Sequence, residues 1–230
     1  MKKLLEEKHT HLVLTISLFA LLVIYPIISA QLTWEILIDI FVIAILIYGV
    51  IIASRTKTHF LISLALALIF LICGWFAQAE SNQTVELISS FSGAAFFSYV
   101  ALILLQEIFR QGERISISMI YSAVSIYLLI GLAFAFFYLA FSILVPGSFS
   151  EPAFMSDDPQ AQLYGFIYFS FVTLSTLGYG DISPNTIQIS AFVYLEAIIG
   201  QLYLTILVAR LVGLQISQAG SSSVKSVEVQ

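Results

Sequence analysis

Six long apolar stretches constrain the fold of this chain more than any other feature of its sequence. They cover residues 12–30, 34–53, 60–79, 85–109, 117–145 and 186–214. Each is long enough to cross roughly 30 Å of hydrocarbon as an α-helix, because a helix rises about 1.5 Å per residue. Hydrophobic residues make up 60% of the 230 residues and charged residues only 10%. The sequence therefore predicts an all-α membrane protein with six transmembrane helices, and the water-soluble classes are excluded.

The charged residues predict how these spans are oriented. When six spans are drawn, all nine basic residues fall on one side of the membrane, and the loops on the other side carry acidic residues. The positive-inside rule then places both termini in the cytoplasm of a multi-pass protein of the cell membrane. The net charge of −5, without a basic cluster, argues against a nucleic-acid partner and leaves the lipid bilayer as the expected surroundings.

A short, weakly polar gap separates the last two apolar stretches. It contains Thr-Leu-Gly-Tyr-Gly-Asp at residues 176–181, preceded by residues 163–174, which predict a helix too short to cross the membrane. Two glycines that flank a tyrosine let the backbone turn its carbonyls in one direction, so that the strip can replace the water around an ion. Such a re-entrant segment is tolerated at membrane depth only where protein buries it or where it lines a water-filled path. The chain has one such strip, so a closed ring of carbonyls requires several copies.

The six residues resemble the selectivity filter of the potassium channel family, and Thr173 and Ser175 extend the match into the preceding pore helix. The resemblance covers residues 117–214 and implies a homotetramer with four filter loops around one pore. No cofactor is expected, and the resemblance implies potassium ions in the pore, held by backbone carbonyls and the Thr176 hydroxyl. The implied filter residues are Thr176, Leu177, Gly178, Tyr179 and Gly180, of which the first four supply the potassium ligands.

Other residues match positions that support the filter in that family. Tyr168 and Phe169 match aromatic residues that brace the filter in relatives, and Thr173 lies beside them in the pore helix. Asp181 is expected either to bond to a pore-helix aromatic or to remain a solvated carboxylate at the mouth.

Glu196 lies at membrane depth in the last span, where an ionised group is expensive unless it has a partner. We expect it to be protonated or hydrogen-bonded to pore-helix hydroxyls such as those of Thr173 or Ser170. A structural brace behind the filter is favoured over ion binding.

The last span also carries the residues expected to gate the pore. Gly200 matches the hinge glycine of the family's inner helix, and the alternative is close packing at a small residue. Helical spacing from Gly200 onward puts four residues on one stripe, which would line a wet cavity and form an apolar constriction if it faces the axis. These residues are Gln201, Leu204, Val208 and Val212.

Domain boundaries follow from these assignments. The prediction is a cytoplasmic N-terminus (1–11), a four-helix membrane domain resembling a voltage-sensor domain (12–110), a linker (111–116), a pore domain (117–215) and a disordered cytoplasmic tail (216–230). The fourth span has no basic residue before Arg110, so it lacks the charges that a strong voltage sensor moves through the field. The resemblance is therefore to six-helix, one-pore-loop potassium channels that lack a charged voltage sensor.

The predicted function is passive, potassium-selective flux through a tetrameric pore without steep voltage gating. A non-selective cation channel is an alternative, because Leu177 replaces the commonest valine and Val172 replaces an acid that supports the filter in some relatives. A silent or regulatory channel subunit is another alternative.

An enzymatic function is not expected from this sequence. His9, His11 and His59 lie near predicted membrane edges, with no cluster of acids or cysteine beside them. Solvated positions are the favoured interpretation for His9 and His11.

Overall fold

The protein is described by a computed structural model, which covers the backbone of residues 2–28, 35–54, 56–80, 82–110, 116–150 and 159–227. Side chains are described for residues 9–23, 40–54, 56–77, 82–110, 116–150 and 161–216.

Seven helices and one short strand pair make up the described residues. They are α1 (Lys2–Ile28), α2 (Glu35–Ala53), α3 (Lys57–Glu80), α4 (Gln83–Arg110), α5 (Ile117–Leu144), β1 (Phe149–Ser150), α6 (Pro159–Leu174), β2 (Ser183–Pro184) and α7 (Ile187–Val227). The mostly helical chain supports an all-α membrane protein.

Four described helices are long and apolar enough to cross a membrane, namely those at Lys57–Ala77, Gln83–Arg110, Ile117–Leu144 and Ile187–Ile216. The apolar parts described for α1 and α2, His9–Val23 and Ile40–Ala53, are shorter. The count of six spans therefore stays a prediction.

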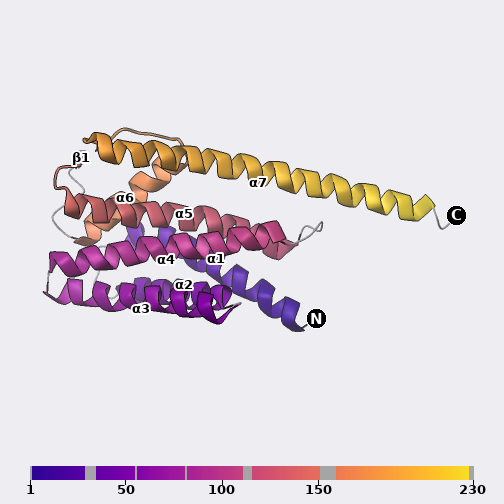
Figure 1. The fold of residues 1–230 in the computed structure, drawn as a ribbon, viewed down its shortest axis with the longest axis horizontal. Helices are drawn as coiled ribbons and strands as arrows, with labels where there is room; N and C mark the ends of the chain where they lie inside the picture. Colours follow the sequence, from indigo (N-terminus) through magenta and orange to yellow (C-terminus); the bar gives the residue numbers. More distant parts are fainter. Residues whose placement is uncertain are drawn as a thin grey trace.

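The helices lie roughly side by side in a bundle, with α6 lodged between α5 and α7 at one end (Figure 1). α4 packs on both α3 and α5, and α1 packs on both α2 and α5. The start of α1 and the end of α7 lie at the same end of the bundle, opposite the end that holds β1 (Figure 1). α5 begins with an N-cap at Ser116, whose hydroxyl accepts a hydrogen bond from the Met119 N–H at 3.2 Å.

The two predicted terminal segments are helical where they are described. α1 begins at Lys2 and so takes in most of the predicted N-terminal segment 1–11. α7 continues to Val227, past residue 215, where the sequence predicts a disordered tail (Figure 1). A helix that has already formed can extend at little cost per residue, because only its first turn is expensive to nucleate. The linker at 111–115 lies outside the described residues.

The buried side chains form two clusters. The larger one joins α1, α2, α4 and α5, with leucines and phenylalanines such as Leu14, Phe96 and Leu129 fully buried. The smaller one lies around α6 and is mainly aromatic, with Tyr138, Phe149, Phe166 and Phe169 at its centre. This second cluster positions the segment that follows α6.

Candidate functional site

The strip after α6 has an unusual backbone. Thr176, Gly178 and Gly180 have φ angles of +60°, +59° and +78°, whereas Leu177 and Tyr179 between them do not have positive φ. Left-handed backbone is open to glycine but disfavoured for a β-branched residue, so Thr176 is a strained position of the kind that clusters at functional sites. Alternation of left- and right-handed residues turns successive peptide groups the same way, which a uniform strand does not do.

Hydrogen bonds fix the direction in which this strip turns. The Leu177 and Gly178 N–H groups both donate to the Val172 carbonyl, at 2.9 and 3.3 Å, and the Thr176 N–H donates to the Thr173 carbonyl at 2.9 Å. The donors thus point back toward α6. In a trans peptide group the C=O points opposite to the N–H, so the carbonyl oxygens of Ser175, Thr176 and Leu177 face away from α6.

The outer end of the strip is tied to α6 by Tyr168. Its hydroxyl donates to Asp181 Oδ2 at 2.6 Å, and its ring stacks on that of Tyr179 at a centroid distance of 6.5 Å. From the sequence, Asp181 is expected either to bond to an aromatic residue of the preceding helix or to be solvated, and the structure shows the first of these. The hydrogen bond from Tyr168 holds the pKa of the Asp181 carboxyl below its usual value, helped by the Ile182 N–H.

Behind the strip, Phe169 is buried among aromatic rings. Its ring centroid lies 5.3 Å from that of Tyr138 and 5.5 Å from that of Phe149. Phe149 belongs to β1, which pairs antiparallel with β2 just after the strip, and the Asn185 N–H donates to the Ser148 carbonyl at 2.8 Å. The sequence does not predict this pairing, which anchors the chain on the far side of Asp181.

Glu196 of α7 is completely buried behind α6. Tyr138 of α5 donates to its Oε2 at 2.6 Å, and Ser170 of α6 contacts its Oε1. Ser170 is one of the two hydroxyl partners expected from the sequence, while Tyr138 is a partner that the sequence reasoning missed. The carboxyl thus joins three helices directly behind the strip.

Gly200 lies one turn further along α7, against the last residue of α6. A Cβ atom at this position would lie 2.3 Å from the Leu174 carbonyl oxygen, which is far inside van der Waals contact. The sequence leaves two explanations for a glycine at this position, a hinge or close helix packing, and this contact supports close packing. The hinge itself stays a prediction.

The residues expected to line the cavity are exposed on the single chain. The Gln201 amide donates to the Thr176 hydroxyl at 3.3 Å, which places it at the inner end of the strip. The others lie further along α7, and they are Leu204, Val208 and Val212. A neighbouring stripe of α7, with Tyr203, Leu207, Leu211 and Leu214, packs instead on the chain's own core.

α7 also contacts the end of α4. The Arg210 guanidinium donates to the Ile108 carbonyl at 2.5 Å and lies over the Phe109 ring, 4.7 Å from its centroid. The last turn of α4 is thereby connected to the part of α7 between Val208 and Val212.

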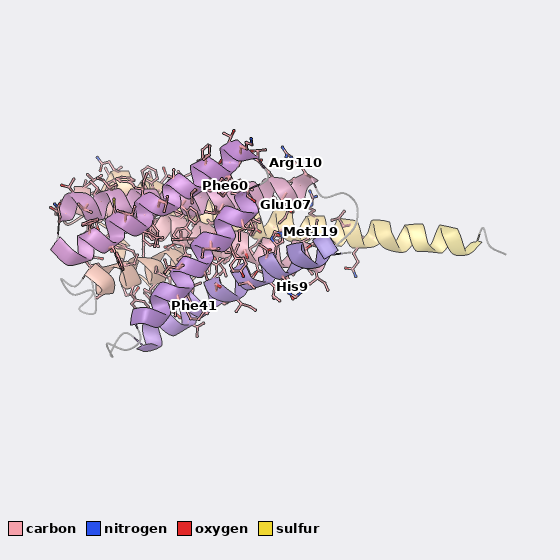
Figure 2. The ribbon with its side chains drawn as sticks, turned by 90° about the horizontal axis from the view of Figure 1, so that it is seen from below. His9, Phe41, Phe60, Glu107, Arg110 and Met119 are labelled. Carbon is pink, nitrogen blue, oxygen red and sulfur yellow. The ribbon has the colours of Figure 1, made fainter. Side chains whose placement is uncertain are left out.

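The favoured interpretation of His11 as a solvated residue is wrong. It is 3% exposed, its Nδ1 lies 3.1 Å from the Ser122 hydroxyl, and its Nε2 lies 3.9 Å from the buried Glu107 carboxyl. The helical N-terminal segment brings His11 into the contact between α1, α4 and α5. Glu107 and Met119 lie near the end of the bundle from which α7 extends (Figure 2).

The geometry described above lies in a segment with a recognisable family pattern. Residues 126–214 match the family model described as an ion channel. The match begins within α5 and contains α6, the strip and most of α7. It supports an ion channel and a membrane-embedded protein. No curated protein and no solved structure matches the chain significantly.

Proposed function

We propose that this protein is a potassium-selective channel whose filter is the strip Thr176–Gly180. The observation that carries the proposal is the alternation of positive φ at Thr176, Gly178 and Gly180, with the Leu177 and Gly178 N–H groups turned to Val172. Carbonyl oxygens aligned in this way suit a dehydrated alkali cation without any side-chain charge. The ion channel match and the resemblance of residues 176–181 to potassium channel filters agree with this assignment.

The pore is proposed to form from four copies of the chain. On one chain the strip is open, with Leu177 57% and Tyr179 66% exposed, and polar backbone at membrane depth cannot face lipid. α7 is similarly uncovered, because only 6% of an apolar 18-residue segment within Ile187–Ile216 is buried, against 61% of such a segment within Ile117–Leu144. Other copies would cover both, and the resemblance to potassium channels sets their number at four.

The proposed topology has six spans and both termini in the cytoplasm of a cell membrane protein. Two observations support it. α1 begins and α7 ends at the same end of the bundle (Figure 1), and this topology places the basic residues on one side of the membrane. Flux is passive, and steep voltage gating is not expected because the only basic residue of α4 is Arg110 in its last turn.

Potassium efflux from liposomes that contain the purified protein tests this function. Gly178→Ala should abolish efflux, since a side chain at φ +59° costs about 1–2 kcal/mol in each chain and displaces two carbonyls of the strip. Gly213→Ala is the matched control, because a Cβ there meets nothing within 4 Å of the same chain. Equal efflux from the two variants would overturn the proposed filter.

The mass of the detergent-solubilised complex tests the stoichiometry. Four times the chain mass of 25.5 kDa is expected after correction for bound detergent and lipid. A monomer or dimer that still conducts would contradict the tetrameric pore.

A further inference from the structure

The contacts of Ser170 determine how many protons its neighbours must supply. The Ser170 hydroxyl oxygen lies 2.7 Å from the Gly131 carbonyl oxygen and also contacts Glu196 Oε1. Both contacts are as short as two-centre hydrogen bonds, in which each contact has its own proton, rather than the longer arms of one proton shared between two acceptors. All three groups are buried, where water cannot provide a substitute donor.

Ser170 carries one hydroxyl proton, and a backbone carbonyl carries none. Two contacts therefore need a second proton, and Glu196 is the only one of the three residues that can supply it. The arrangement is complete when Ser170 donates to Gly131 and a protonated Glu196 donates to Ser170. Tyr138 then donates to Oε2, the carbonyl oxygen of the neutral acid.

From this count we infer that Glu196 is a neutral carboxylic acid that positions the filter, and that its ionisation releases the filter from α7. This inference rests on the proposed function of the strip. Ser170 lies in the last two turns of α6, and Val172, two residues further along the same helix, supplies the carbonyl that accepts from the Leu177 and Gly178 N–H groups. Loss of the Glu196 proton leaves Ser170 able to serve either the carboxylate or Gly131, but not both.

The groups around Glu196 give an ionised carboxylate little support. Two phenols of α5 interact with it, Tyr138 through a hydrogen bond and Tyr127 from further away. α6 contributes the neutral hydroxyl of Ser170. An unpaired charge in such a site is destabilising, so we expect alkaline pH to weaken the support of the filter and acidic pH to preserve it.

The decisive variant is Glu196→Gln in the full-length protein. A glutamine amide can donate to Ser170 and accept from Tyr138, so it reproduces the bonds of the neutral acid without a proton to lose. Wild-type potassium current in bilayers should fall as the pH of both solutions rises. Glu196→Gln should keep its current and its preference for potassium over sodium, and should lose the alkaline fall.

Tyr138→Phe provides a second comparison. It removes the donor to Oε2 but leaves the Glu196 proton in place, so its potassium selectivity should be reduced while the alkaline fall persists. A Glu196→Gln protein that folds as a tetramer but loses selectivity would overturn the inference, because a charged carboxylate would then be required. An alkaline fall that is unchanged in Glu196→Gln would also overturn it.

Infrared difference spectra of the same proteins measure the protonation state independently of current. A carbonyl-stretch band of a buried neutral acid should be present in the wild type at neutral pH, disappear at alkaline pH and be absent from Glu196→Gln. A wild type without this band overturns the inference even if the channel conducts. A protein that shows the band but conducts at no pH refutes the proposed function and leaves the neutral acid standing.

Discussion

Gly200→Ala is the substitution for which the structure gives the clearest expectation. The added Cβ would lie 2.3 Å from the Leu174 carbonyl oxygen and 2.9 Å from a methyl carbon of the Leu174 side chain. The side chain can rotate away, but the carbonyl belongs to the last residue of α6 and cannot. The backbone of α6 or α7 must therefore shift, and any shift is transmitted to the strip that begins two residues after Leu174.

The magnitude follows from two opposing effects. Overpacking a well-packed interior destabilises by about 1–3 kcal/mol, whereas alanine in place of glycine inside a helix stabilises by about 1 kcal/mol. The opposing atom here is backbone, so the clash belongs in the upper part of its range, and we expect a net loss of about 1–2 kcal/mol per chain. At Gly213 no atom of the chain lies within 4 Å, so Gly213→Ala should keep the helix gain alone.

Thermal unfolding of the two variants in detergent, followed by their potassium-to-sodium permeability ratios, measures both effects. Gly200→Ala should unfold at a lower temperature than wild type and lose selectivity, and Gly213→Ala should do neither. Equal stability and selectivity in the two variants would refute the close approach of α7 to α6. A change in open probability alone, with normal stability and selectivity, would instead favour a hinge at Gly200.

Three further predictions concern charged groups. The Tyr168 hydrogen bond favours the ionised Asp181 carboxylate and so lowers its pKa. The bond therefore stabilises the folded protein fully above the ordinary carboxyl pKa, and this stabilisation is lost as the pH falls through the lowered pKa. Tyr168→Phe should therefore move any acid-induced loss of current to higher external pH, and an unchanged pH profile would contradict this. Arg210→Met removes a charged donor to the Ile108 carbonyl and should lower the free energy of unfolding by about 1–3 kcal/mol, measured by thermal unfolding. A stability equal to that of the wild type would show that the contact contributes nothing. The open probability of the channel should vary little between negative and positive membrane potentials. Each gating charge supplies about 2.3 kcal/mol per 100 mV, and α4 (Gln83–Arg110) carries no basic residue before its last turn. A steep voltage dependence would show that a voltage sensor lies outside α4.

The helices were the part of the fold that the sequence could predict. Long apolar runs have few alternatives to helix, and the observed α3, α4 and α5 begin or end within three residues of the predicted stretches. The short α6 was also predicted, although it begins at Pro159 rather than at residue 163. Proline is favoured in the first turn of a helix, and this signal could have placed the start correctly.

The contacts between helices were only partly predictable. A buried acid surrounded by apolar residues has few possible partners, which is why Ser170 could be named for Glu196 from the sequence. Tyr138 could not, because it lies 58 residues away in an apolar helix whose rotation the sequence does not determine. The burial of His11 was missed for a related reason, since the helix that carries it starts earlier than the apolar stretch indicates.

The reversal potential of the purified protein in a planar bilayer, with potassium on one side and sodium on the other, tests the central claim most directly. A selective filter at Thr176–Gly180 predicts a strongly displaced reversal potential, in the direction that carries potassium from its own side. A reversal potential near zero would contradict potassium selectivity and would identify a non-selective cation pore.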